Sequence, residues 1–136
     1  MVKSKFAIAT HIMTFLAAYT DEWISSNHLA SSLNINPVLV RKELIILKEN
    51  NLIQSKEGKN GGVKLFKPAS KIKLSDIFSI AKGDDHILSF SKNEGNPNCP
   101  IGSNIKKNLG KIYIQMDDII EQTLSKMTLE EFKNQF

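Results

Sequence analysis

The amino-acid sequence predicts a mostly α-helical fold with one small β-hairpin, arranged as a winged helix-turn-helix domain followed by a long C-terminal helix. Three observations predict it. Two short helical segments meet at a tight turn that ends in Asn36 and Pro37. Two strand-like segments flank a glycine-rich loop at residues 57–62. Apolar residues then recur at steps of three and four across residues 101–127.

The first helix is predicted over about residues 4–19. Its apolar side chains, from Phe6 to Tyr19, recur with the spacing of one helical face. Ser4 is expected to cap the helix with its hydroxyl. We expect His11 to be a hydrogen-bonded structural residue rather than a metal ligand, because the three histidines have no metal-binding spacing.

The helix-turn-helix is predicted from its capping residues. A serine cap, from the pair Ser25 and Ser26, is expected to open the second helix, and Asn36 the third. Pro37 suits the first position of a helix, where a backbone N–H has no partner in any case. The third helix is expected to end at Asn50 and Asn51, because Asn tolerates the left-handed conformation of many helix ends. Its inward face is predicted to be Val40, Leu44 and Leu47.

The wing is predicted as strands at residues 52–56 and 63–67, with Pro68 ending the second strand. A helix beginning at Ser75 and closed by Gly83 follows, then a loop over residues 84–100. Thr128 begins a capping-box pattern near the C-terminus. We therefore divide the chain into a winged helix-turn-helix DNA-binding domain (1–82), a loop that is a candidate sensor region (83–100), and a dimerisation helix with a C-terminal tail (101–136).

Charge is unevenly distributed along the chain. Residues 1–73 contain 11 Lys and Arg against 5 Asp and Glu, whereas residues 74–136 contain 7 against 9. A basic half suits a polyanion such as DNA, although a solvated surface could show the same imbalance by chance. No apolar run is long enough for a membrane span, and the N-terminal segment is interpreted as a helix rather than a signal peptide. We expect a cytoplasmic, nucleoid-associated protein.

The third helix and the wing are the predicted DNA-contacting elements. Arg41 could form a bidentate contact with a guanine edge in the major groove, Lys42 a base or phosphate contact, and Val38 a contact with a thymine methyl. The wing supplies lysines for phosphate and glycines that allow close approach. The alternative is that these side chains are only the solvated face of an amphipathic helix and hairpin. The predicted DNA-binding residues are Ser25, Ser26, Asn27, Asn36, Pro37, Val38, Arg41, Lys42, Lys56, Lys59, Asn60, Gly61 and Gly62.

The long helix is predicted to form a homodimer. Residues 101–127 would span about 40 Å, beyond what so small a domain can cover. Lysines gather in the first half and acidic residues, including Asp117, in the second, an order that opposes the helix dipole. An antiparallel or crossed twofold partner would bring the basic half against the acidic half. A helix packed entirely on its own domain is the alternative. The predicted dimer seam is Ile105, Leu109, Ile112, Met116, Ile119 and Thr123.

Other function classes lack their motifs. The wing loop has no Gly-Lys-Ser/Thr of a nucleotide-binding P-loop, and no nucleophile–base pair stands out. One cysteine, Cys99, cannot build a zinc site or an iron–sulfur cluster by itself. We expect no enzyme activity, no metal and no cofactor. The remaining alternative is a small helical protein–protein interaction module without DNA binding.

A set of short motifs is spread over nearly the whole chain: Asn36-Pro37-Val38-Leu39-Val40-Arg41-Lys42, Leu47-Lys48, Leu52-Ile53, Gly58, Gly61-Gly62, Ile72-Lys73-Leu74-Ser75-Asp76-Ile77 and Asn96-Pro97-Asn98-Cys99-Pro100-Ile101-Gly102. In these motifs the chain resembles the Rrf2-type winged-helix transcriptional regulators, the family of IscR, NsrR and CymR, and within it the cluster-free, YwnA-like subgroup. This resemblance implies a dimeric DNA-binding regulator, most often a repressor.

Two positions depart from the family pattern. Cluster-binding members have three closely spaced cysteines before the long helix, where this chain has only Cys99, so the resemblance implies no iron–sulfur cluster here. The cluster-binding members also often place an arginine just before the wing glycines, for the minor groove. This chain has Glu57 there, so such a contact falls to Lys56 or Lys59 or is absent.

Cys99 is a candidate redox residue, because the resemblance implies thiol-based sensing in some cluster-free relatives. It could form a Cys99–Cys99′ bond between subunits, a mixed disulfide or a sulfenic acid. We expect it at the N-terminal end of the long helix, a location that lowers a thiol pKa. An unreactive thiol is the alternative. Control by an unknown small-molecule or protein effector also stays open.

Overall fold

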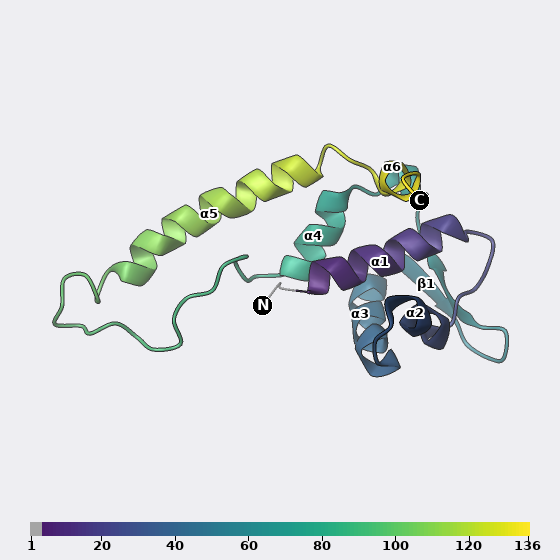
Figure 1. Ribbon diagram of the computed structural model, residues 1–136, viewed down its shortest axis with the longest axis horizontal. Helices are drawn as coiled ribbons and strands as arrows, with labels where there is room; N and C mark the ends of the chain where they lie inside the picture. Colours follow the sequence, from purple (N-terminus) through teal and green to yellow (C-terminus); the bar gives the residue numbers. More distant parts are fainter. Residues whose placement is uncertain (1–3) are drawn as a thin grey trace.

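Six α-helices and a two-stranded hairpin make up the described part of the chain, residues 4–136 of a computed structural model (Figure 1). Residues 1–3, part of the predicted N-terminal segment, lie outside it. The predicted fold class is confirmed. Along the chain, the elements are α1 (Lys5–Ala18), α2 (Ser26–Leu33), α3 (Pro37–Glu49), β1 (Ile53–Lys56), β2 (Gly62–Leu65), the 3-10 helix η1 (Ala69–Lys71), α4 (Leu74–Lys82), α5 (Ile105–Leu124) and α6 (Leu129–Lys133).

The helix-turn-helix has the predicted capping residues. Ser25 Oγ accepts a hydrogen bond from the backbone N–H of residue 28 at 3.1 Å. Asn36 Oδ1 accepts one from the Val38 N–H at 2.9 Å, and Pro37 occupies the first position of α3. Asn51 has a left-handed φ of 59° just after the helix. These ends are set locally, because each cap is bonded to a residue two or three positions away.

Two predicted helix ends are wrong. Ser4 stands at the N-cap position of α1, but its backbone is helical and its side chain makes no capping hydrogen bond. The long helix contains 20 residues, not the predicted 27, because residues 96–104 form their own hydrogen-bonded turns before it. At 1.5 Å per residue α5 is about 30 Å long. Cys99 therefore lies six residues before the first residue of α5, rather than at its end.

The wing is a shorter hairpin than predicted, with one additional β-bridge to its second strand. β1 and β2 pair antiparallel from Ile53 opposite Leu65 to Lys56 opposite Gly62. Ile24, between α1 and α2, pairs with Val63 through two backbone hydrogen bonds of 3.0 and 2.8 Å. Gly62 is needed for this pairing, because its φ is +151° and a Cβ there would lie 2.4 Å from the Ile24 carbonyl oxygen.

The core lies between α1, α3, α4 and the wing, and α6 closes it. Leu129 of α6 is fully buried, and the strand-like pairing of Lys73 with Thr128 joins the start of α6 to the start of α4. Thr128 Oγ1 accepts the N–H of Glu131, as the predicted capping box requires. None of the helices between residues 4 and 136 combines the length and apolarity of a membrane span. The largest fully buried side chains are Ile12, Met13, Leu16, Leu29, Val40, Leu47, Ile72, Ile77 and Leu129.

Candidate nucleic-acid interface

Helix α3 presents its predicted contact residues to solvent. Val40, Leu44 and Leu47 face the core, as predicted, so the opposite face of the helix is outward. Arg41 and Lys42 are exposed there, and Val38 is 48% exposed. An apolar side chain left half-exposed beside two cations suits a base edge better than bulk water. Whether these residues contact DNA stays a prediction.

Glu43 is a functional-site neighbour that the sequence interpretation did not single out. It lies on the buried side of α3, and only 9% of its surface is exposed. This burial raises the pKa of the Glu43 carboxyl above its ordinary value, and the nearby Lys5 cation opposes the rise in pKa. The Glu43 carboxyl therefore points away from the exposed face of α3, which is the face that would meet phosphate.

The predicted residues at the starts of α2 and α3 mainly shape the backbone. The side-chain oxygens of Ser25 and Asn36 already accept capping hydrogen bonds. Ser26 and Pro37 are half-buried, whereas Asn27 is exposed. The first turn of α2 still has unpaired backbone N–H groups at its positive dipole end, which suits a phosphate oxygen.

The wing exposes its predicted polar residues and uses its glycines internally. Lys56, Lys59 and Asn60 are exposed. A Cβ on Gly61 would lie 2.0 Å from the Lys56 carbonyl oxygen, and a Cβ on Gly62 would clash with the Ile24 backbone. The loop therefore needs both glycines for its own geometry, whether or not DNA approaches them.

Trp23, between α1 and α2, lies beside the wing and was not among the predicted site residues. Its ring lies under two wing lysines, with the Lys64 Nζ 4.9 Å and the Lys56 Nζ 5.9 Å from the ring centroid. The pairing of Ile24 with Val63 was not predicted, so Trp23 was not expected beside the hairpin. The available signal was Trp23-Ile24 itself, a short β-prone pair directly before the Ser25 cap.

Cys99 lies in a tight turn before α5. Gly102 N–H points to Cys99 Sγ at 3.4 Å, and Cys99 N–H donates to the Asn96 carbonyl at 3.1 Å. Backbone hydrogen bonds from Gly102 and then Ile101 lower the pKa of the Cys99 thiol. The predicted direction of the pKa shift is right, but its cause is this turn and not the end of the long helix.

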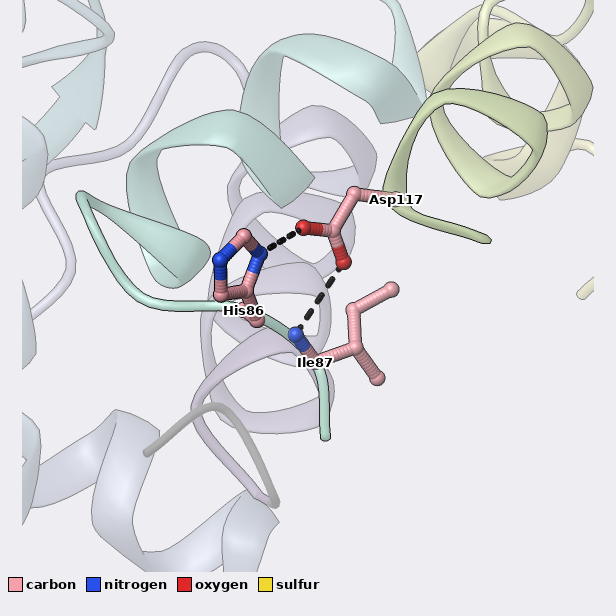
Figure 2. Close-up of polar contacts among 3 residues, drawn as sticks. All are labelled: His86, Ile87 and Asp117. Carbon is pink, nitrogen blue, oxygen red and sulfur yellow. Dashed lines mark hydrogen bonds and ion pairs between the residues drawn. The ribbon is translucent and has the colours of Figure 1, made fainter. Parts of the chain in front are cut away.

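The loop between α4 and α5 is bound to α5 by Asp117, as Figure 2 shows. The Asp117 carboxylate meets His86 Nδ1 at 2.7 Å with one oxygen and accepts the Ile87 N–H at 3.1 Å with the other. Tyr113, one turn earlier, donates its hydroxyl to the Ser89 carbonyl at 3.0 Å. Asp117 is buried, so it is used inside the chain and does not face a partner helix as predicted.

A separate apolar face of α5 is uncovered. Ile112 is 50% and Ile119 62% exposed, whereas Tyr113 and Asp117 on the adjoining face are buried. Figure 1 shows α5 extending away from the helix-turn-helix. An apolar groove of about 800 Å³ also lies between α1 and α6, lined by five aromatic rings. The predicted seam residues that are exposed are Ile105, Ile112, Met116, Ile119 and Thr123, and Leu109 is half-buried.

Comparisons with known proteins agree on one family. A family model described as "Rrf2: Iron-dependent Transcriptional regulator" matches residues 2–135. YwnA of Bacillus subtilis (strain 168), named as a candidate HTH-type transcriptional regulator, is 29% identical over 134 residues, which cover 98% of each chain. The crystal structure of a candidate transcriptional regulator from Lactobacillus plantarum matches with a TM-score of 0.78 and 26% identity, over 97% of this chain and 89% of that one. CymR of B. subtilis, the global cysteine regulator, shares the fold with a TM-score of 0.72 at 20% identity, over 98% and 95% of the two chains.

The residues present do not fit the iron of the family description. Cys99 is the sole cysteine of the chain. Across residues 4–136, no three His, Cys, Asp or Glu side chains gather closely enough to hold a metal ion. A mononuclear iron needs several such ligands, commonly histidines and a carboxylate, and an iron–sulfur cluster needs several thiolates.

Proposed function

The chain belongs to the Rrf2 family of DNA-binding transcriptional regulators, and on that premise we propose that it is a homodimeric repressor that contacts DNA with α3 and the wing. The observation that carries this proposal is the exposed face of α3, where Arg41 and Lys42 project beside Val38. The lysines of the wing add charge for the flanking phosphates. Such a repressor would act on the chromosome, at the nucleoid.

The homodimer is supported by the uncovered face of α5. Three exposed isoleucines on this face, Ile105, Ile112 and Ile119, repeat at seven-residue steps, as in a helix–helix seam, and one chain leaves them in water. Lys107 and Lys111 near one end, and Asp118 and Glu121 near the other, remain exposed for an antiparallel partner. A twofold dimer would place its two α3 helices on half-sites about one helical turn of DNA apart, or a multiple of it.

We further propose that the protein works without a cofactor or catalysis and responds to thiol oxidation at Cys99. A peroxide is the simplest oxidant: the thiolate sulfur attacks one peroxide oxygen, the O–O bond breaks, hydroxide leaves, and a sulfenic acid forms. The lowered pKa of the thiol favours this attack by enriching the thiolate. A small ligand or a protein effector is the alternative mode of control, and the groove between α1 and α6 is where such a ligand would be sought.

Duplex binding at two salt concentrations tests the main proposal. Genomic footprinting would first supply the operator. Binding to it should weaken steeply with added salt, because each neutralised phosphate releases a counterion, with a log–log slope of about −0.9 per contact. Absence of binding to any duplex at low salt would leave only the interaction-module alternative.

Mass spectrometry after mild peroxide treatment tests the role of Cys99. We expect a sulfenic acid or disulfide at Cys99, and a change in operator binding that the Cys99→Ser variant does not show. Equal binding by the oxidised wild type, the reduced wild type and the variant would end the sensor proposal while leaving the repressor proposal intact.

A further inference from the structure

Trp23 lies on the same face of the wing as two of its lysines. The backbone pairing of Ile24 with Val63 sets their neighbours, Trp23 and Lys64, side by side on the outer face. Lys56 belongs to this face too, because it pairs with Gly62 two residues from Lys64 along β2. The distances from the ring centroid, 4.9 Å for Lys64 Nζ and 5.9 Å for Lys56 Nζ, are those of cation–π contacts.

This arrangement restricts two side chains that would otherwise be mobile. An exposed lysine normally samples many rotamers, and two like charges on one face repel each other. The negative face of an indole attracts an ammonium group and is the strongest of the aromatic side chains in this respect. The ring therefore keeps both ammonium groups on the outer face before any ligand arrives.

We propose that Trp23 is a positioning residue for DNA binding, which holds Lys56 and Lys64 ready to meet the phosphate backbone. Trp23 also lies two residues before the Ser25 cap of α2. The ring thus joins the wing lysines to the N-terminal turn of α2, so that two phosphate-binding elements keep a set spacing. This inference rests on the proposed function, since it assumes that the wing contacts DNA.

A double-mutant cycle tests whether Trp23 acts through the lysines. The probe is a fluorescein-labelled mixed-sequence duplex of about 30 base pairs, long enough for two half-sites, titrated at low and higher salt. Affinity would be measured for wild type, Trp23→Leu, Lys56→Ala/Lys64→Ala and the triple variant. Trp23→Leu should weaken binding about two- to fivefold, the size of a lost cation–π contact. In the background without Lys56 and Lys64 it should cost nothing.

Lys59 provides the matched control. It is an exposed lysine at the tip of the same wing, and neither cation–π contact of the ring involves it. Trp23→Leu should therefore cost the same in a Lys59→Ala background as in wild type. An equal cost in all three backgrounds would show a merely structural role and overturn the inference. Wild type that binds no duplex at all would instead refute the proposed function.

The ring can also be followed directly, which covers the case that Trp23→Leu does not fold. Trp23 is the single tryptophan of the chain, so all tryptophan fluorescence reports on this site. Quenching by acrylamide should increase in Lys56→Ala/Lys64→Ala, because the lysine stems no longer cover the ring, and should stay unchanged in Lys59→Ala. Identical quenching in wild type and the double variant would overturn the inference.

Discussion

At the scale of single residues, helix α3 exposes its cations and buries a carboxyl group. Its two neighbouring cations, Arg41 and Lys42, are exposed, while the carboxyl of Glu43 is turned into the protein. This separation leaves no exposed carboxylate beside Arg41 and Lys42 in the first half of the helix. The effect of Arg41 on DNA binding and the effect of Glu43 on stability can be measured separately.

Arg41→Ala should weaken binding to the footprinted operator by about 1–3 kcal/mol, and binding to a mixed-sequence duplex by less, because a bidentate contact with a base edge discriminates between sequences. Fluorescence anisotropy with both duplexes gives the two affinities. Lys48→Ala is the control, since Lys48 is an exposed cation in the last turn of the same helix. Equal losses on both duplexes would mean that Arg41 contacts only phosphate.

Glu43→Gln should stabilise the protein at neutral pH. The folded-state pKa of Glu43 lies above its ordinary value of 4.5, so the folded chain binds this proton more tightly than the unfolded chain. The free energy of unfolding therefore falls as pH rises from 4.5 through the raised pKa. The melting temperature of the variant should exceed that of wild type by roughly 3 °C at pH 7, the effect of about 1 kcal/mol, and by less at pH 4. A difference that does not change with pH would contradict this prediction.

At the scale of elements, α5 has one face that is packed and one that is exposed. One face, with Tyr113 and Asp117, packs on the chain's own loop. The adjoining face carries the proposed dimer seam and is open. A helix of 20 residues therefore packs on its own chain with one face and leaves the other free for the proposed dimer.

Ile112→Asp should convert the proposed dimer to monomer, because a buried charge at a helix seam costs several kcal/mol. Sedimentation velocity at micromolar concentration checks this. Ile114→Asp is the matched control: Ile114 is 54% exposed on the same helix but lies outside the seam. If both variants remain dimeric, or the wild type is monomeric, the seam is not the interface.

At the scale of the whole molecule, contacts between segments distant in sequence hold the C-terminal third to the rest. The start of α6 pairs with the start of α4, and α6 packs on α1 and η1. His86 and Asp117, 31 residues apart, join the loop that contains Cys99 to α5. The loop that contains Cys99 is therefore anchored to the helix proposed to form the dimer.

Asp117→Asn should loosen this loop, at a cost of about 1–2 kcal/mol for the weakened charged hydrogen bonds. Hydrogen–deuterium exchange of the Ile87 amide, which donates to Asp117, should accelerate. The neighbouring Asp118 is exposed, so Asp118→Asn should leave that exchange unchanged. If Ile87 exchanges at the wild-type rate in Asp117→Asn, the carboxylate does not hold the loop.

The helix-turn-helix, the wing and the exposed face of α3 could all be predicted from the sequence. These features depend on local signals: a cap bonds to a residue two or three positions away, and an amphipathic repeat defines which face is inward. The same reasoning overestimated α5, because an apolar repeat continues through residues 101–104 while their backbone is already bonded within a turn.

Contacts between side chains far apart in the sequence could not be predicted and are seen in the folded chain alone. Trp23 and Lys64 lie together because Ile24 pairs with Val63, which was not predicted. Asp117 was predicted to face a partner helix and instead binds His86 within the chain. The thiol pKa of Cys99 is lowered by the turn around it rather than by a helix dipole. A periodic pattern shows that a face is apolar or charged, but the path of the chain decides what that face touches.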